Sequence, residues 1–181
     1  RCLIRKCKLL GNQDTIFASG ENSRQLFEEC YIEGTVDFIF GSSTALFDKC
    51  HIHSKADGYV SAASTPEWVV YGYVFKNCKL TADLGVTKVY LGRPWRDYAK
   101  TVFIDCELGA HILPEGWHNW GRPQTEATTY FAEYNSKGPG ATNTKRVNWA
   151  KQLTKSELAN YSKSDIFAGK INQETSTFWS E

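Results

Sequence analysis

The sequence predicts an all-β protein, a parallel β-helix with a short helical tail at its C-terminal end. Three observations lead to this class: a motif that recurs around five of the six cysteines, the regular interval between its copies, and the absence of helical patterns between them. The cysteines of successive copies are 23, 20, 28 and 28 residues apart, which is a spacing typical of solenoid repeats. The copies are Ile4-Arg-Lys-Cys7-Lys-Leu9, Phe27-Glu-Glu-Cys30-Tyr-Ile32, Phe47-Asp-Lys-Cys50-His-Ile52, Phe75-Lys-Asn-Cys78-Lys-Leu80 and Phe103-Ile-Asp-Cys106-Glu-Leu108.

Each copy of the motif predicts one strand region of one coil. The cysteine and the aliphatic residue two positions later share one face of a strand, and the polar residue between them faces outward. The residue three before the cysteine has the wrong parity for that face, which predicts a bend inside every unit. Since no helical segment of about 10–15 residues separates the copies, βαβ units are disfavoured.

Stacking of such coils predicts a ladder of cysteines inside the core. The ladder cysteines would be small apolar residues, reduced and unpaired. For Cys2, which lies outside the ladder, a disulfide stays open.

The chain is predicted to be a single domain over residues 1–181, with coils in 1–110, loops and late strands in 111–149, and a partly helical tail in 150–181. Residues 150–169 are expected to form a short helix, with a capping box at Thr154-Lys-Ser-Glu157. A helical tail would cover the open end of the solenoid, an edge that otherwise invites aggregation.

Bulk composition excludes several classes of function. Apolar residues make up 41% and charged residues 23% of the chain, as in ordinary globular proteins. The net charge of +1 produces no strong field toward nucleic acid or a membrane surface, and no apolar run is long enough for a transmembrane helix. The six Trp residues point weakly to a flat ligand such as a sugar ring, although large cores also hold Trp.

Two aspartates occupy equivalent places in neighbouring repeats, since Asp14 and Asp37 each follow a ladder cysteine by seven residues. In register, their carboxylates would lie about 5 Å apart, the distance between adjacent strands. Repulsion at that distance raises the pKa of one carboxylate, while a neighbouring cation would keep the other ionised. Such a split supplies an acid and a nucleophile from one residue type. Asp57 shares the same spacing and Asp is common in turns, so spacing alone does not identify a functional pair.

The segments around these acids resemble signature motifs of the pectin methylesterase family, and the similarity extends through about residue 150. The late aromatic segment Gly116-Trp117-His-Asn-Trp120 is also similar to one in that family. A further segment, 57–65, looks more like the bacterial or insect members than the plant type. The three motifs are Gly11-Asn-Gln-Asp-Thr-Ile-Phe17, Tyr31-Ile-Glu-Gly-Thr-Val-Asp-Phe-Ile-Phe-Gly41 and Leu91-Gly-Arg-Pro-Trp95, in the family's order.

The resemblance implies a right-handed parallel β-helix that hydrolyses the methyl esters of homogalacturonan to pectate and methanol. It implies a polysaccharide as the partner, with no cofactor, no metal, no nucleic acid and no membrane. A secreted or periplasmic location follows from a polymer substrate outside the cell, and we expect a monomer. The family also carries an earlier motif with a second oxyanion Gln, which these 181 residues lack; on this resemblance, upstream coils are expected to supply it.

The resemblance also implies roles for individual residues. Asp37 would attack the ester carbonyl, and Asp14 would protonate the departing methanol and then activate water. Gln13 would donate a hydrogen bond to the oxyanion, and Arg93 would pair with Asp37. Trp95 would stack on a sugar ring.

Two further aromatic residues, Phe40 and Trp117, are predicted to line the cleft. For both, a place in the core is an equally good interpretation. An amide ladder is the alternative for Gln13 and a surface ion pair is the alternative for Arg93, but the position of Gln13 beside Asp14 and the motif around Arg93 favour function. His51 and His53 share a strand face, but without a further ligand nearby they predict a solvated face rather than a metal site.

One rival is a different β-helix enzyme that acts on the same substrate. A pectate lyase would need a Ca²⁺ site of clustered acids, and a polygalacturonase would need an adjacent Asp-Asp pair and a Gly-His-Gly segment, which the sequence lacks. The other rival is a non-catalytic carbohydrate-binding β-helix; a related esterase acting on another substrate by the same mechanism is a third alternative. The intact set of polar residues in the motifs favours catalysis.

Overall fold

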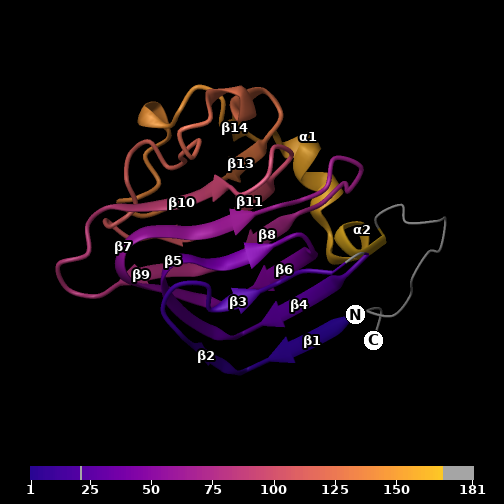
Figure 1. Ribbon diagram of the computed structural model, residues 1–181, viewed down its shortest axis with the longest axis horizontal. Helices are drawn as coiled ribbons and strands as arrows, with labels where there is room; N and C mark the ends of the chain where they lie inside the picture. Colours follow the sequence, from indigo (N-terminus) through magenta and orange to yellow (C-terminus); the bar gives the residue numbers. More distant parts are fainter. Residues whose placement is uncertain (21, 169–181) are drawn as a thin grey trace.

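The computed structural model describes residues 1–20 and 22–168, which wind as a right-handed parallel β-helix (Figure 1). Two sheets of parallel strands form its walls, and the strands of both sheets follow one another in chain order along the solenoid axis. The first sheet contains β1 (Cys2–Arg5), β4 (Arg24–Glu28), β6 (Thr44–Asp48), β8 (Tyr73–Lys76), β11 (Lys100–Ile104), β13 (Tyr130–Tyr134) and β14 (Lys151–Gln152). The second contains β2 (Lys8–Leu10), β5 (Tyr31–Gly41), β7 (His51–Ala63), β9 (Lys79–Ala82) and β12 (Glu107–Leu108), with β3 (Ile16–Phe17) against β5 and β10 (Val89–Pro94) against β7.

The bend predicted inside each repeat is a single left-handed residue between the two sheets. Every strand of the first sheet from β1 to β13 is followed by a non-glycine residue with φ between 49° and 55°. One residue in this conformation turns the chain sharply, which reverses the side-chain parity between the strand before it and the strand after it. The corner residues are Lys6, Glu29, Lys49, Asn77, Asp105 and Asn135.

The parity change places two ladders inside the same core. The rings of Phe27, Phe47, Phe75 and Phe103 stack face to face, with centroids 4.7, 4.5 and 4.4 Å apart. After the corner, the cysteines of four successive coils are buried, while Cys7 of the first coil is exposed. No cysteine is bonded to another in the structure. The predicted place inside the core is confirmed for Cys30, Cys50, Cys78 and Cys106 and is wrong for Cys7, which lies in the first coil and is exposed.

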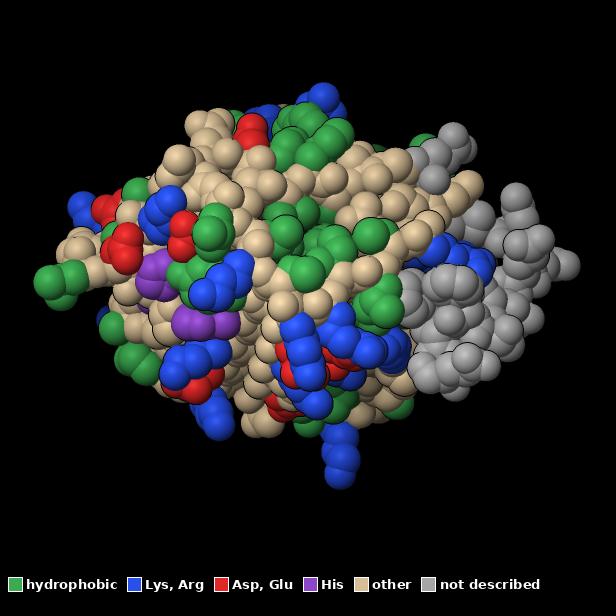
Figure 2. Space-filling view, turned by 90° about the horizontal axis from the view of Figure 1, so that it is seen from below, with side chains coloured by type: hydrophobic (Ala, Val, Ile, Leu, Met, Phe, Trp, Pro, Cys, Tyr) green, Lys and Arg blue, Asp and Glu red, His purple; other side chains and the backbone are tan. Residues whose placement is uncertain are grey.

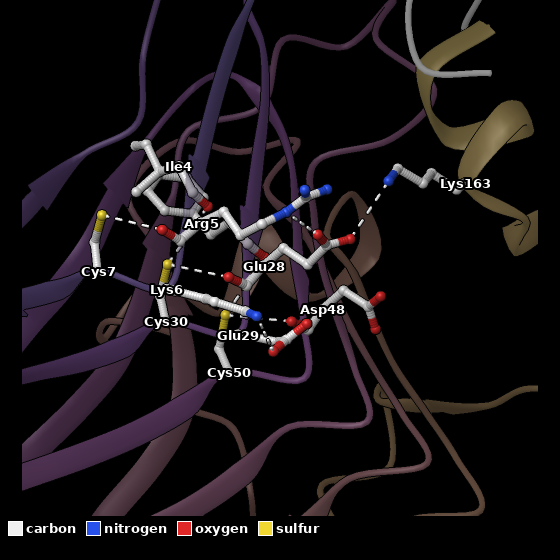
Figure 3. A network of polar contacts seen from close by, with 11 residues as sticks. Ile4, Arg5, Lys6, Cys7, Glu28, Glu29, Cys30, Asp48, Cys50 and Lys163 are labelled. Carbon is white, nitrogen blue, oxygen red and sulfur yellow. Dashed lines mark hydrogen bonds and ion pairs between the residues drawn. The ribbon is translucent and has the colours of Figure 1, made fainter. Parts of the chain in front are cut away.

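The cysteine ladder is also a ladder of weak hydrogen bonds between coils (Figure 3). The thiol of Cys30 donates to the carbonyl of Ile4 at 3.4 Å, and the thiol of Cys50 donates to the carbonyl of Phe27 at 3.4 Å. Cys78 and Cys106 repeat the arrangement one coil further along each time. The thiols therefore bind carbonyl oxygens of the preceding coil at the corner where the backbone leaves the first sheet.

The helical tail forms as predicted but lies elsewhere than expected. It contains α1 (Lys155–Leu158), η3 (Ala159–Tyr161) and α2 (Lys163–Ala168), and the capping box between Thr154 and Glu157 is present. Its buried residues pack on the outer apolar stripe of the first sheet, which includes Leu26, Leu46, Val74 and Val102. The tail therefore covers the flank of the solenoid (Figure 1), and the prediction that it covers the open end is wrong. Residues 169–181 of the predicted tail lie outside the described residues.

The two ends of the solenoid differ. At the β12 end, the core is covered by loop residues such as Val147 and Trp149, in a region that also holds η1 (Pro123–Ala127) and η2 (Asn143–Lys145). At the β1 end, Leu3, Leu10 and Phe17 are 45 to 62% exposed; Figure 2 views this end from below and shows hydrophobic side chains in its middle. Over residues 1–20 and 22–168, no helix is long and apolar enough to cross a membrane.

Candidate active site

The strands that carry the predicted site lie side by side on the second sheet. Phe17 of β3 is opposite Phe40 of β5, and Phe40 is opposite Ala62 of β7. Ala62 in turn is opposite Arg93 of β10. The first of these pairs has the same 23-residue offset as the two aspartates, so Asp14 and Asp37 occupy equivalent positions on adjacent coils, as predicted.

Both aspartates have a left-handed backbone, with φ of 57° at Asp14 and 52° at Asp37. Asp37 lies where the pairing of β5 with β7 shifts register between Val36 and Ile39. Bulges of this kind re-aim a side chain, and non-glycine residues held in the left-handed region gather at functional sites because the surrounding structure must hold them there. The backbone amide of Asp14 donates to the carbonyl of Val36 at 3.2 Å, which connects the two turns.

Arg93 holds Asp37 by a two-pronged ion pair. Its Nε donates to Oδ1 of Asp37 at 2.9 Å and its Nη2 donates to Oδ2 at 2.7 Å. Asp37 is 5% exposed, so this pair is shielded from water. Paired bonds to a carboxylate fix both its charge and its orientation.

Two aromatic rings hold the guanidinium from both sides. The central carbon of Arg93 lies 3.9 Å from the ring centroid of Tyr59 and 3.5 Å from that of Trp120. Tyr59 stacks in turn on Tyr90, with centroids 5.3 Å apart. No sequence motif marks Tyr59 as a site residue, because its place on β7 opposite Tyr90 of β10 follows only from the register of these strands.

The pKa of Asp37 is raised above its ordinary value, first of all because the carboxyl group is buried. The hydrogen bonds and the charge of Arg93 lower the pKa, and the negative charge of Asp14 raises it. Burial, rather than repulsion within the pair, is thus the main cause of the shift. A raised pKa makes the ionised carboxylate more basic and more nucleophilic, and Arg93 favours the ionised form.

A pocket of about 220 Å³ joins these residues. Its polar wall is formed by Asp14, Asp37, Gln13 and Arg93, and Gln13 and Asp14 are exposed. Its remaining lining residues are Phe40, Ala62, Trp95 and Trp120.

An aromatic cluster stands at the edge of this pocket. Phe40 stacks on Phe17 with centroids 4.7 Å apart, and Trp95 is 5.7 Å from Phe40. Phe17, which is 60% exposed, was not predicted as a site residue; the signal for it is its repeat position, which is that of Phe40. The cluster offers flat apolar surface beside the carboxylates.

Trp117 is not part of the pocket, so the prediction that it lines the cleft is wrong. It is buried in the core, where its ring stacks on Phe131 with centroids 4.5 Å apart and its indole N–H donates to Glu133. Trp117 bridges to Gly92 of β10, and this register directs it inward. Trp120, three residues later with φ of 59°, takes the place in the pocket.

Asp57, His51 and His53 lie outside the pocket and contact other parts of the scaffold. Asp57 accepts hydrogen bonds from the backbone amides of Thr87 and Lys88, both at 2.9 Å, so it holds the turn that precedes β10. His51 and His53 both contact the hydroxyl of Thr81, and no cluster of three or more metal-ligating side chains occurs in the described part of the chain.

The fold and the site together define a class of protein: a parallel β-helix in which two aspartates from adjacent coils line one pocket beside aromatic side chains. The sequence profile described as Pectinesterase matches residues 1–170, and the chain therefore belongs to the pectinesterase family, as the motifs predicted.

Curated relatives and solved structures agree with this assignment. Pectinesterase 31 of Arabidopsis thaliana is 40% identical over 162 residues, covering 89% of this chain and 50% of the relative. The pectin methylesterase from carrot superposes with a TM-score of 0.81 at 30% identity, covering 90% of this chain and 55% of that one. The enzyme from Yersinia enterocolitica gives 0.78 at 33% identity, with coverages of 91% and 59%. The chain thus spans about half the length of the curated relatives it matches.

Proposed function

We propose that this chain carries the catalytic centre of a pectin methylesterase, which hydrolyses methyl esters of homogalacturonan to pectate and methanol. The observation that supports this most strongly is the buried Asp37 carboxylate, which Nε and Nη2 of Arg93 both bind, with Asp14 at the equivalent position of the preceding coil. A nucleophile, an orienting cation and a second acid are the parts that ester hydrolysis through a covalent intermediate requires.

In the first half of the proposed reaction, a carboxylate oxygen of Asp37 attacks the ester carbonyl carbon. The carbonyl oxygen gains negative charge, and the side-chain amide of Gln13 stabilises it by donating a hydrogen bond. Asp14 protonates the methoxy oxygen as the bond from the carbonyl carbon to that oxygen breaks, so methanol leaves and an anhydride joins Asp37 to the galacturonate.

In the second half, Asp14 is ionised and takes a proton from water. The water oxygen attacks the galacturonate carbonyl carbon of the anhydride, and the bond to Asp37 breaks. This releases the free acid and restores both aspartates to their starting states. Arg93 keeps the Asp37 side chain in place while Asp37 loses its negative charge in the anhydride and regains it on hydrolysis.

The proposed substrate is a polysaccharide, bound outside the cell or in the periplasm by a monomer. Trp95, Phe40 and Phe17 provide apolar surface against which sugar rings would stack. A structural neighbour, a pectin methylesterase solved in complex with a hexasaccharide, has a TM-score of 0.76 at 31% identity, covering 91% of this chain and 56% of that chain. The roles of nucleophile, acid and oxyanion donor are part of this proposal.

The test is methanol release from highly methylated pectin by the full-length protein and by its Asp37→Asn variant. We expect release by the parent and loss in the variant. Asp57→Asn is the matched control, because Asp57 also follows its ladder cysteine by seven residues but holds a turn outside the pocket. Release by Asp37→Asn at the parent rate would refute Asp37 as the nucleophile. Pectin binding without methanol release by the folded parent would favour the carbohydrate-binding alternative.

A further inference from the structure

The turn that carries Gln13 and Asp14 is exposed and belongs to the first coil. The proposed reaction nevertheless requires a fixed position for the Asp14 carboxyl group. Gln13 and Asp14 precede the two-residue strand β3, and Asp14 has the left-handed backbone that L-residues rarely adopt. An exposed turn in this conformation keeps its shape only if neighbouring groups hold it.

A lysine from two coils away holds this turn. Nζ of Lys55, on β7, donates to the carbonyl oxygen of Gly11 at 2.9 Å and to Oδ1 of Asn12 at 3.0 Å. The two residues it binds immediately precede Gln13 and Asp14 in the chain. The lysine side chain therefore reaches across β5, from the third coil to the first.

The residue between them on β5 completes the arrangement. Glu33 pairs with Lys55, with Nζ and Oε1 3.3 Å apart, and its other oxygen accepts from the hydroxyl of Tyr31 at 3.0 Å. The backbone carbonyl of Glu33 accepts from the hydroxyl of Thr15 at 3.0 Å. Glu33 thus orients the ammonium group from one side while its backbone holds the far end of the turn.

The turn lies close against β5 because Gly34 has no side chain. A Cβ at that position would stand 2.6 Å from the carbonyl oxygen of Asn12, which accepts a hydrogen bond from the amide of Thr35 at 2.9 Å. Lys55 and Gly34 therefore both act on Asn12, and together they keep the turn against the strand that carries Asp37.

We propose that Lys55, oriented by Glu33, is a positioning residue for Gln13 and Asp14. This inference rests on the proposed function, in which Asp14 protonates the leaving alcohol and Gln13 donates to the oxyanion. Without the lysine, the turn loses two charge-assisted hydrogen bonds and the acid loses its fixed distance to the departing oxygen. A displacement of about 1 Å in a catalytic group costs about a hundredfold in rate.

Misplacement of Asp14 and loss of folded protein would change the rates for two different esters in different ways. An acid that protonates the leaving group matters greatly for methanol and less for an alcohol whose anion leaves readily, such as 2,2,2-trifluoroethanol. A misplaced Asp14 therefore lowers kcat/KM for a methyl ester more than for a trifluoroethyl ester of the same oligogalacturonate. A partly unfolded sample lowers both values by the same factor.

The experiment compares the two esters in the full-length parent and in Lys55→Met, Lys55→Arg and Lys79→Met. Lys79→Met is the matched control, because Lys79 pairs with Glu107 on the same sheet at 3.7 Å and is not among the groups that hold the 11–15 turn. We expect the methyl-to-trifluoroethyl ratio of kcat/KM to fall about tenfold in Lys55→Met. The ratio should stay at the parent value in Lys79→Met and recover most of the loss in Lys55→Arg.

Three results would overturn the positioning role of Lys55, and a fourth would overturn the proposed function as well. An equal fall for both esters in Lys55→Met, or the same ratio in Lys55→Met and Lys79→Met, would overturn the positioning role while leaving the proposed function intact. A fall in the ratio that Lys55→Arg does not reverse would also overturn it, because a cation of similar reach is then not sufficient. Release of neither alcohol by the folded parent would overturn the proposed function and this inference with it.

Discussion

Replacement of Arg93 tests the centre of the site, because this side chain contacts three residues of the pocket and its surroundings. Nε and Nη2 bind the two carboxylate oxygens of Asp37 at 2.9 and 2.7 Å, and the flat guanidinium group lies against the rings of Tyr59 and Trp120. Lysine keeps the charge but has a single nitrogen, so Arg93→Lys loses at least one of the two bonds and the flat contact with the rings.

The expected fall in kcat/KM follows from the free energy of the lost hydrogen bond. A hydrogen bond to a charged group contributes about 1.5–3 kcal/mol, and about 1.4 kcal/mol corresponds to a tenfold change in rate. We therefore expect kcat/KM of Arg93→Lys to fall about ten- to hundredfold, measured as initial rates of methanol release from methylated pectin.

Arg93→Gln adds a pH signature to the same test. Asp37 must be ionised to attack, so activity is present above its pKa and lost as the pH falls through it. Arg93 lowers this pKa against the effects of burial and of Asp14. Without the cation the pKa rises further, so the acid limb of the kcat/KM profile should move to higher pH. Arg93→Lys activity within about twofold of the parent, or an unmoved acid limb in Arg93→Gln, would refute this reasoning.

Two further predictions concern the scaffold. Phe75 stacks between Phe47 and Phe103, so Phe75→Ala should lower the free energy of unfolding by about 3–5 kcal/mol, with Phe75→Leu losing clearly less; equal losses in urea titrations would argue against the ring ladder. Burial lowers the pKa of His111 from 6.5 to about 4, so the folded state disfavours its protonation and loses stability as the pH falls through this window. His111→Leu should remove up to about 3 kcal/mol of the loss between neutral pH and pH ~4, and an unchanged pH dependence of unfolding would contradict this.

Much of the site was predictable because a solenoid turns sequence distance into spatial distance. Asp14 and Asp37 share a repeat position, and so do Phe17 and Phe40, so both pairs meet across one strand spacing. The bend before each cysteine followed from side-chain parity alone. The place of Arg93 beside Asp37 followed from the family motif, since the repeat by itself does not align it.

The errors arose where the repeat ends. Trp117 and Trp120 lie in a loop without periodicity, and only the bridge between Trp117 and Gly92 decides which ring enters the core. The helical tail has a readable capping box, but its docking site is the apolar stripe outside the first sheet. No pattern within the tail itself indicates which of two apolar surfaces it will cover.

The sequence alone therefore determined the coil, its ladders and the pairing of the acids, because each follows from a repeated local pattern. The tertiary structure decided which neighbours surround those acids. The enclosure of Arg93 by Tyr59 and Trp120, the burial that raises the pKa of Asp37, and the reach of Lys55 to Gly11 all join residues from different coils. Such contacts depend on side-chain length and direction in the packed state, which spacing along the chain does not encode.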